Sequence, residues 1–216
     1  YRHDTGRFEQ IELLSGEKFV DCIFEDNNRT VWIGTPSGVE LFRLDGGERS
    51  KMYLKDYAGT DNVKTISQDK RGRIWLGTRN YGIVIYDSAK GVYDVTINNR
   101  IGNNTINHIY NDTKGRIWIA MDEGLLLVSD PDSLDTTVFT VADGLACDKI
   151  CSLTEDAFGN MWMSTNVGIS SYNEHERKFY NFDVEDGVLQ GSYFPNSTAR
   201  TLNGDIYFGG LHGVCY

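Results

Sequence analysis

Large aromatic residues recur in this chain at an almost constant interval. Trp32, Trp75, Trp118 and Trp162 lie 43, 43 and 44 residues apart, and Tyr207 follows after another 45. A fixed period of about 20 to 50 residues is typical of repeat architectures, in which each unit buries its apolar face against its neighbours. The chain therefore consists of about five similar units, and its fold follows from the structure of one unit.

Two further positions keep their character relative to the recurring aromatic residue. An Asp stands six residues before it in the first four units, and a small residue stands two residues after it in all five. Three of these Asp residues open an Asp-x-x-Gly sequence, in which the Asp side chain accepts backbone N–H groups and Gly takes the positive φ of a hairpin turn. We therefore interpret the Asp residues as turn formers and the aromatic residues as packing groups, in preference to acid–base, metal-binding or sugar-stacking roles. These structural repeat residues are Trp32, Trp75, Trp118, Trp162, Tyr207, Asp26, Asp69, Asp112 and Asp156.

Each unit has the pattern of four short strands. In the second unit, residues 63–69 alternate apolar and polar, 74–77 are centred on the tryptophan, 83–86 follow a glycine, and 93–97 form a less regular fourth segment. No stretch shows a helical period of 3.6 residues. Four-stranded units of about 40 to 45 residues are typical of β-propeller blades. We predict an all-β fold, a β-propeller of four-stranded antiparallel blades, with about five blades present as part of a larger propeller.

The repeat phase suggests how the chain is divided. Residues 1–216 form a single propeller region, with repeats at approximately 1–14 (the end of a blade), 15–57, 58–100, 101–144, 145–186 and 187–216 (the start of a blade). The two terminal pieces either complete one blade together or are both edges of a longer array. An open arc would leave two apolar blade faces exposed, and for this case we predict self-association.

Composition excludes several classes of partner. The chain has 31 acidic and 21 basic residues, a formal net charge of −10, and no basic stripe. A balance of this sign repels nucleic acid and anionic lipid, so we expect neither as a partner. The apolar runs are shorter than the roughly 20 residues that span a bilayer, and no charged-then-apolar leader opens the chain. We expect a soluble piece, with contact to a membrane only through a larger parent protein.

The sequence contains no recognisable catalytic pattern. A Gly-rich phosphate loop, a metalloprotease His pair, a nucleophile elbow and a kinase signature are all missing, so we predict no catalytic residues, no cofactor and no metal site. The histidines stand in four different repeat contexts and lack ligand spacing. The cysteines favour free thiols, although a disulfide stays open as an alternative. The histidines are His3, His108, His175 and His212, and the cysteines are Cys22, Cys147, Cys151 and Cys215.

Ligand-binding candidates come from the loops between second and third strands, which form one face of a propeller. The loop with Arg79, Asn80 and Tyr81 is one residue longer than its equivalents and offers donors beside an aromatic ring. Glu123 and His212 stand in the equivalent loops of later units. A long connection in the last unit adds Tyr193 and Asn196.

The repeat resembles a known family. The pattern apolar-x-x-Ile-x-x-Asp-x-x-Gly-x-Ile-Trp-Ile-Gly-Thr-x-x-Gly-Leu is similar to the two-component regulator propeller repeat, and residues 63–82 and 106–124 match it closely. The linking phrase at 141–145 is also similar, whereas the last unit departs with Tyr207 for Trp and Thr201 for Asp. This repeat occurs in periplasmic sensor regions of Bacteroides-type hybrid histidine kinases, usually as two rings of about seven blades.

The resemblance implies an extracytoplasmic sensor segment that detects a carbohydrate-derived ligand, for example an oligosaccharide, and relays it through adjacent domains of the parent protein. Two rival hypotheses stay open. The first is a secreted propeller enzyme similar to streptogramin lyases, for which His212 and Glu123 with a divalent metal would be the candidate pair. The second is a purely structural protein-interaction ring.

Overall fold

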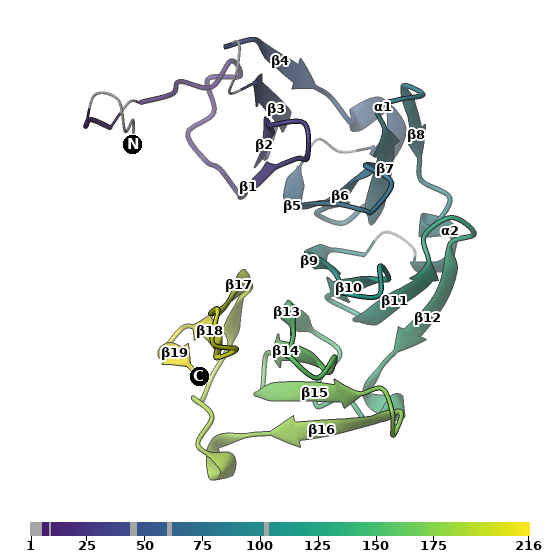
Figure 1. The fold of residues 1–216 in the computed structure, drawn as a ribbon, viewed down its shortest axis with the longest axis vertical. Helices are drawn as coiled ribbons and strands as arrows, with labels where there is room; N and C mark the ends of the chain where they lie inside the picture. The colour runs from purple at the N-terminus through teal and green to yellow at the C-terminus, as the bar shows by residue number, and fades with distance from the viewer. Residues whose placement is uncertain (1–5, 9, 44–46, 60–61, 102–103) are drawn as a thin grey trace.

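The chain folds into sheets that follow one another along an arc (Figure 1). The computed structural model describes residues 6–8, 10–43, 47–59, 62–101 and 104–216. The described strands form five sheets, four with four strands and one with three, and each sheet keeps the order of the chain. The prediction of an all-β propeller with about five blades is confirmed, and the fifth sheet differs from it in having three strands.

The strands pair in antiparallel fashion within each blade. Blade 1 contains β1 (Cys22–Glu25), β2 (Thr30–Thr35), β3 (Gly38–Arg43) and β4 (Arg49–Met52). Blade 2 contains β5 (Val63–Gln68), β6 (Ile74–Thr78), β7 (Ile83–Asp87) and β8 (Val92–Asp94). Blade 3 contains β9 (Ile106–Asn111), β10 (Ile117–Met121), β11 (Gly124–Asp130) and β12 (Asp135–Phe139). Blade 4 contains β13 (Ile150–Glu155), β14 (Met161–Thr165), β15 (Ile169–Asn173) and β16 (Lys178–Phe182), and blade 5 contains β17 (Tyr193–Arg200), β18 (Ile206–Gly210) and β19 (Gly213–Cys215).

The connections between blades contain short helical turns that the sequence pattern did not predict. Two are α-helical, α1 (Lys55–Ala58) and α2 (Asn98–Ile101), and two are 3₁₀ turns, η1 (Val141–Asp143) and η2 (Val184–Asp186). Each is a single turn, too short to show a helical period. Both 3₁₀ turns begin with a capping box, which satisfies their first backbone N–H groups.

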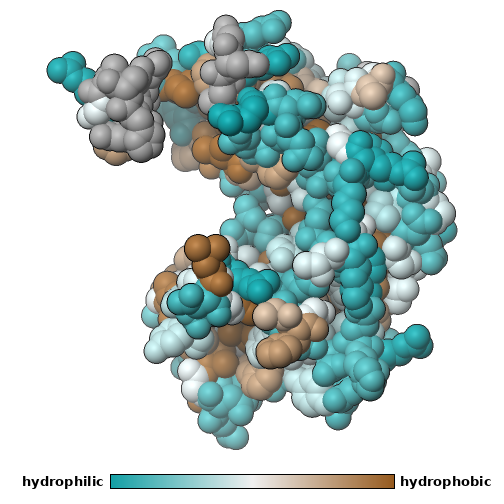
Figure 2. Space-filling model, in the orientation of Figure 1, coloured by the Kyte–Doolittle hydropathy of each residue, from teal (hydrophilic) through white to brown (hydrophobic). Residues whose placement is uncertain are grey.

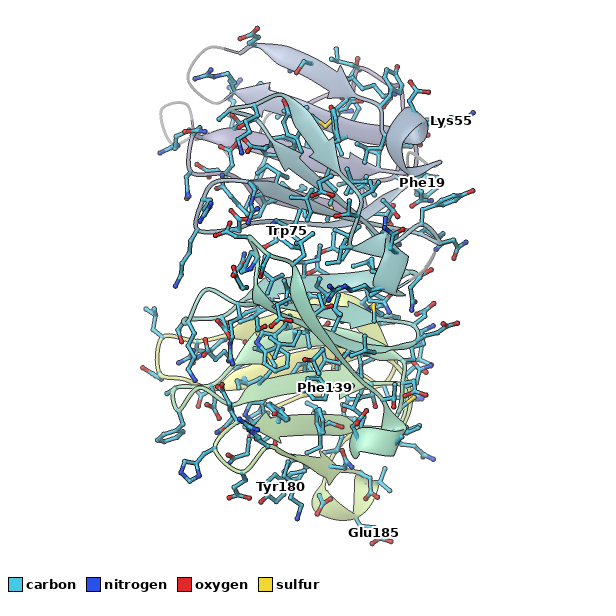
Figure 3. All side chains as sticks on the ribbon, turned by 90° about the vertical axis from the view of Figure 1, so that its right-hand side faces the viewer. Phe19, Lys55, Trp75, Phe139, Tyr180 and Glu185 are labelled. Carbon is cyan, nitrogen blue, oxygen red and sulfur yellow. The ribbon has the colours of Figure 1, made fainter. Side chains whose placement is uncertain are left out.

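The core lies between neighbouring blades, because successive side chains of a strand point to opposite faces of the sheet. Trp75, Ile83 and Ile85 of blade 2 pack in one cluster with Ile117 and Ile119 of blade 3. Figure 3 shows Trp75 and Phe139 among the sheets and Lys55 and Glu185 at the periphery. Each of the four tryptophans therefore packs in the cluster that joins its blade to the next, as a packing role requires.

The small residue two positions after the aromatic faces the innermost strand. Thr65 pairs directly with Gly77, His108 with Ala120, and Ser152 with Ser164. A Cβ atom on Gly77 would lie 2.5 Å from Thr65 Cγ2 and 2.6 Å from Ile106 Cγ2 in blade 3. Real Cβ atoms do not approach other heavy atoms this closely, so the site accepts no larger residue without movement of two blades.

This contact leads to a first prediction. Gly77→Val should lower the free energy of unfolding by about 2–3 kcal/mol, since overpacking displaces neighbours that are already close-packed. Adding Thr65→Ser to Gly77→Val should recover part of the loss, because it removes the nearer methyl group. Urea denaturation would measure both variants. If Gly77→Val unfolds at the urea concentration of the parent chain, the contact does not limit side-chain size.

The two ends of the arc leave apolar side chains exposed. On blade 1 they include Phe19 and Ile23, at 73% and 68% exposure, and on blade 5 Val214 and Tyr216, at 59% and 90%. Figure 2 shows apolar residues on both sides of the opening in the arc. Among the described residues no helix is long and apolar enough to cross a membrane.

Candidate functional site

The Asp-x-x-Gly turns lie on one rim of the arc, and their carboxylates are fully engaged. The Asp69 Oδ1 atom accepts the backbone N–H groups of Arg71 and Arg73 at 2.9 and 3.0 Å, and its Oδ2 atom accepts the indole N–H of Trp75 at 3.0 Å. Gly72 takes φ 84°, the turn conformation that favours glycine. The tryptophan contact was not foreseen, although the constant six-residue spacing is its signal.

The same contact recurs in the other three tryptophan-bearing blades. The distance between the indole nitrogen and the Asp Oδ2 atom is 2.8 Å in blade 1 and 2.9 Å in blades 3 and 4. Hydrogen bonds from Trp162 and Asn160 hold the pKa of Asp156 below its usual range, although burial by itself raises it. An Asp that is occupied in this way positions the tryptophan, and no oxygen is left for acid–base or metal chemistry.

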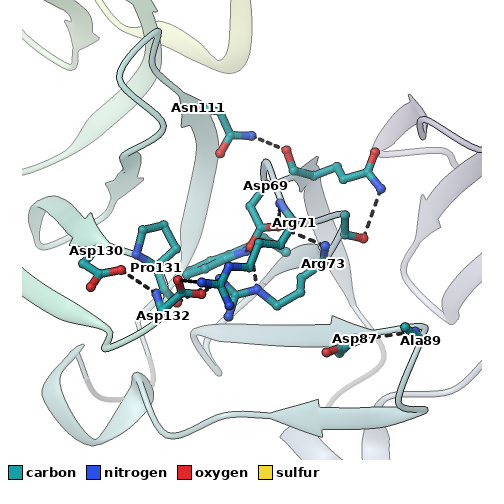
Figure 4. A network of polar contacts seen from close by, with 12 residues as sticks. Asp69, Arg71, Arg73, Asp87, Ala89, Asn111, Asp130, Pro131 and Asp132 are labelled. Atoms are coloured by element: carbon teal, nitrogen blue, oxygen red, sulfur yellow. Dashed lines mark hydrogen bonds and ion pairs between the residues drawn. The ribbon is translucent and has the colours of Figure 1, made fainter.

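Arginines join this rim across two of the blade interfaces, and Figure 4 shows the interface between blades 2 and 3. Arg73 Nε lies 2.6 Å from Asp69 Oδ2, and its Nη2 atom reaches the Pro131 carbonyl at 2.9 Å and Asp132 at 3.3 Å in the β11–β12 hairpin of blade 3. Arg71 also pairs with Asp132. The rim is thus held by ion pairs between consecutive blades.

The next interface repeats the arrangement. Arg116 Nε lies 2.6 Å from Asp112 Oδ2, and the two terminal nitrogens bind Glu174 of blade 4 at 2.5 and 3.0 Å. Burial raises the pKa of Glu174, but hydrogen bonds from Arg116 and Lys114 outweigh it and hold this pKa below its usual range. These inter-blade pairs were not predicted, because the partners lie 58 residues apart in the sequence.

The opposite face carries the loop that the sequence analysis selected. The backbone N–H of Arg79 donates a hydrogen bond to the carbonyl oxygen of Asn62 at 3.0 Å. Asn80 takes φ 67° and exchanges hydrogen bonds with Thr105 of blade 3. In one of them Thr105 Oγ1 donates to Asn80 Oδ1 at 2.7 Å. The Tyr81 ring lies against Gly59, where a Cβ atom would be 2.6 Å from Tyr81 Cε1. The backbone of this loop is therefore fixed, while the Arg79, Asn80 and Tyr81 side chains stay exposed.

Glu123 and His212 are also exposed, in the β10–β11 and β18–β19 loops. Asp122, next to Glu123, accepts a hydrogen bond from Asn107 Nδ2 at 3.0 Å, and its carboxylate lies 3.5 Å from Lys149 Nζ. The His212 ring packs beside Gly191. In the part of the chain that the structure describes, no group of three or more His, Cys, Asp or Glu residues could hold a metal ion.

Tyr193 and Asn196 do not lie in a connection, so that part of the prediction is wrong. Both belong to β17, whose register shifts between Tyr193 and Thr198. Tyr193 is 3% exposed and packs in a core cluster, and burial raises its pKa. Asn196 is exposed with φ 55°. The irregular pairing, with Pro195 within it, gives the sequence of a strand the appearance of a loop.

The innermost strands are linked by polar side chains from one blade to the next. Between blades 1 and 2, Lys64 Nζ lies 2.6 Å from Asp21 Oδ1. Between blades 3 and 4, Asn107 Nδ2 donates a hydrogen bond to the Ile150 carbonyl oxygen at 2.8 Å. At the same interface His108 Nδ1 accepts a hydrogen bond from the backbone N–H of Leu153 at 2.9 Å. Desolvation lowers the pKa of His108 to about 4. The four cysteines are free thiols, and burial raises the pKa of Cys151 to about 11.

A cavity of about 790 Å³ opens between blades 1 and 2 beside Trp32. The Tyr86 and Tyr93 rings lie on one side of it, with their centroids 4.8 Å apart, and Tyr86 lies 6.2 Å from Trp32. Its lining also includes charged groups, namely Arg43, Lys51 and Asp56.

The chain thus forms consecutive four-stranded blades, and in each of the first four a tryptophan that is hydrogen-bonded to an Asp packs against the next blade. This arrangement defines a β-propeller repeat protein. The model of the two-component regulator propeller family matches residues 14–37, 58–80 and 100–123. Three of its repeats thus match the two-component regulator propeller repeat, which confirms the resemblance noted in the sequence.

Solved and curated relatives agree with this assignment. The extracellular domain assigned to the hybrid two component system BT3049 from B. thetaiotaomicron is 35% identical with a TM-score of 0.89, and the match covers 100% of this chain and 30% of that chain. A protein named Histidine kinase P4 from Formosa agariphila is 25% identical over 90% of this chain, which spans 12% of its length. Virginiamycin B lyase from Staphylococcus aureus, 13% identical with a TM-score of 0.73 over 93% of this chain and 66% of the lyase, shares the fold alone.

Proposed function

We propose that this chain is a propeller segment of the extracytoplasmic, periplasmic sensor region of a hybrid two-component histidine kinase. The observation that carries the proposal is the 35% identity over the full chain to an extracellular domain assigned to a hybrid two component system. The repeats in the chain and the similarity to a histidine kinase support the same class. Kinase chemistry would belong to other parts of the parent protein.

The reading frame around the chain tests this proposal directly. Further propeller repeats before Tyr1, with a membrane helix and a histidine kinase after Tyr216, would establish the sensor role. A stop codon shortly after Tyr216 would contradict it and leave a free-standing secreted propeller. Sequencing of the parent gene in both directions gives either result without any assumption about ligand.

We further propose that the exposed loop face binds a carbohydrate-derived ligand. Arg79, Asn80 and Tyr81 present donors and an aromatic ring on a backbone that blade 3 holds in place. Preorganised loops lose little conformational entropy on binding, and aromatic rings beside hydrogen-bond donors suit the apolar and polar faces of a sugar. Glu123, Asn196 and His212 are exposed candidates in other blades, whereas Tyr193 is too deeply buried to take part.

Binding alone would not transmit a signal. A ligand shifts a conformational equilibrium only by the difference in its affinity for the two states. The fixed loop and the inter-blade ion pairs make the arc suited to act as a rigid body against adjacent domains. In this scheme the ligand would change how the propeller contacts those domains, and a purely structural ring would show no such dependence.

Hydrogen exchange tests the ligand surface. With a panel of oligosaccharides from plant and algal polysaccharides, we expect slower exchange in residues 78–82 with at least one sugar. Tyr81→Ala should weaken binding of that sugar about tenfold, as loss of a contact aromatic does. Val167→Ala, at an exposed position in the equivalent loop of blade 4, should leave binding unchanged. If no sugar alters exchange in this loop, the structural-ring hypothesis is favoured, and the reading-frame result is unaffected.

A further inference from the structure

The interfaces after blades 2 and 3 each contain an arginine that binds the repeat Asp of its own blade. In blade 2, Arg73 Nε lies 2.6 Å from Asp69 Oδ2, as Figure 4 shows. In blade 3, Arg116 Nε lies 2.6 Å from Asp112 Oδ2. In both blades the same Oδ2 atom also accepts the indole N–H of the tryptophan. This carboxylate oxygen therefore serves two donors, one from the indole and one from the guanidinium.

Blade 1 keeps the Asp and the tryptophan but lacks the arginine. Thr30 occupies the position of Arg73, two residues before Trp32. Asp26 Oδ2 accepts the Trp32 indole N–H at 2.8 Å, and among the described residues no second donor reaches this oxygen. An ionised carboxylate oxygen can accept two hydrogen bonds, so one acceptor position of Asp26 stays open. Asp26 is only 8% exposed, so this open position lies inside the protein.

The acidic partner of the arginine is replaced at this interface as well. Between blades 3 and 4, the terminal nitrogens of Arg116 bind Glu174. Ser88 of blade 2 has the position of Glu174, since each directly follows the third strand of its blade. Thr30 and Ser88 both line the cavity between blades 1 and 2. Two short hydroxyl residues thus leave open the space that an arginine and a glutamate fill two blades later.

Aromatic rings surround the place of the missing guanidinium. Between blades 3 and 4, the guanidinium carbon of Arg116 lies 5.4 Å from the centroid of the Trp118 ring, which is a cation–π distance. In the cavity between blades 1 and 2, Trp32, Tyr86 and Tyr93 line the equivalent space. Aromatic faces beside a buried carboxylate oxygen suit a planar, delocalised cation.

The size and the charges of the cavity are compatible with a small cation. Its volume of about 790 Å³ lies within the range of roughly 300–1,000 Å³ that is typical of small-molecule sites. Its charged lining consists of two acids, Asp26 and Asp56, and two bases, Arg43 and Lys51. The Lys51 ammonium lies over the Tyr53 ring, 4.6 Å from its centroid. The net charge of −10 on the whole chain favours the approach of a cation over that of an anion.

We propose that the cavity between blades 1 and 2 binds a small molecule with a guanidinium group, such as free arginine. The guanidinium would take the place that arginine side chains hold in the next two interfaces, and would donate to Asp26 Oδ2 beside the Trp32 ring. Arg43, which pairs with Thr30 across β2 and β3, supplies a positive charge for the carboxylate of an amino acid. This site depends neither on the sensor role nor on the loop face.

Calorimetric titration with matched ligands tests whether the cavity recognises the guanidinium charge. L-arginine should bind the chain, and agmatine, which keeps the guanidinium but lacks the carboxylate, should bind as well. L-citrulline has nearly the same shape with an uncharged urea group, and it should bind at least about tenfold more weakly than L-arginine, because hydrogen bonds between charged partners are stronger. Failure of both arginine and agmatine to bind at millimolar concentration would overturn the proposal, and so would equal binding of citrulline.

Thr30→Arg tests where the ligand binds, because it allows the chain to fill the cavity with its own arginine. This variant should bind L-arginine at least about tenfold more weakly than the parent chain. Leu202→Arg adds the same charge at a fully exposed position in the equivalent turn of blade 5, and should bind like the parent chain. Circular dichroism should show that Thr30→Arg is folded, since blades 2 and 3 carry arginine at this position.

Two outcomes of this comparison would contradict the site. If Thr30→Arg binds L-arginine like the parent chain, the ligand lies elsewhere. If Leu202→Arg loses as much affinity as Thr30→Arg, binding follows the net charge of the chain and not the cavity. The citrulline comparison uses the parent chain alone, so it decides the proposal even if Thr30→Arg does not fold.

Discussion

Asp112→Ala should lower the free energy of unfolding by about 3–5 kcal/mol, because it removes one partner from a buried, charged network. The Asp112 side chain is 0% exposed. Its Oδ2 atom accepts Trp118 Nε1 at 2.9 Å and Arg116 Nε at 2.6 Å, and its Oδ1 atom accepts Arg116 N at 2.9 Å. The substitution leaves the Trp118 indole N–H and the Arg116 Nε–H without their acceptor, while Glu174 still binds the terminal nitrogens of Arg116.

Denaturation in urea, followed by tryptophan fluorescence, would measure the loss. Asp94→Ala is a suitable control, since Asp94 also accepts a backbone N–H, that of Thr96 at 2.8 Å, but is exposed and binds no tryptophan. Its cost should be about 0.5–1 kcal/mol, the value of a single exposed turn hydrogen bond. Equal costs for the two variants would show that the buried network adds nothing to the turn.

Acidification should destabilise the chain through His108 before its carboxylates titrate. The pKa of His108 is about 4 in the folded state against an ordinary value of 6.5. The unfolded chain therefore binds a proton at His108 more readily than the folded chain does. The stability that neutral His108 contributes is fully present above pH 6.5 and is lost as the pH falls toward 4. Between pH 6.5 and 4.5 the loss should be about 2–3 kcal/mol. Protonation would also remove the acceptor for Leu153 N, now 2.9 Å from His108 Nδ1.

The comparison that isolates this effect is His108→Thr, which places in blade 3 the residue that blade 2 carries at the equivalent position, Thr65. Urea denaturation at pH 6.5 and pH 4.5 should show a smaller difference for this variant than for the parent chain. Hydrogen bonds hold the pKa values of Glu174 and Asp156 below their usual range although burial raises them, so the stability that these groups contribute is lost mainly below this window. A parent chain whose stability is constant between the two pH values would contradict the assignment.

The propeller architecture could be predicted from the sequence because the same residue types recur at the same spacing in successive units, so each unit supports the interpretation of the others. The spacing of the tryptophans predicted the blades, and the Asp-x-x-Gly pattern predicted the turns. The same pattern did not show that Asp69 also binds Trp75, since a turn alone was a sufficient explanation. Contacts such as Arg116 with Glu174 join residues 58 positions apart, and a local pattern carries no information on them.

The candidate site was less accessible from sequence. The position of the loop with Arg79 and Tyr81 followed from strand order, but the hydrogen bonds of Asn80 with Thr105 depend on the distance between two blades. The prediction of Tyr193 as a surface group is wrong because the irregular register of β17 makes this strand look like a loop in the sequence. Its ring is buried in the core. The polar links among the innermost strands have no motif, since each blade contributes a different residue type.

Arginine two positions before the tryptophan occurs where the following blade offers an acid: Arg73 faces Asp132, and Arg116 faces Glu174. At the interface between blades 1 and 2, uncharged Thr30 and Ser88 line the same cavity instead. Near-identical tandem repeats can exchange partners during folding, since any blade could dock on any other. Here a wrong order would enclose a guanidinium opposite a hydroxyl group or leave a carboxylate unmatched. The charges therefore disfavour docking of blade 2 behind a blade that carries this arginine, while they do not distinguish blade 3 from blade 4 as the acceptor.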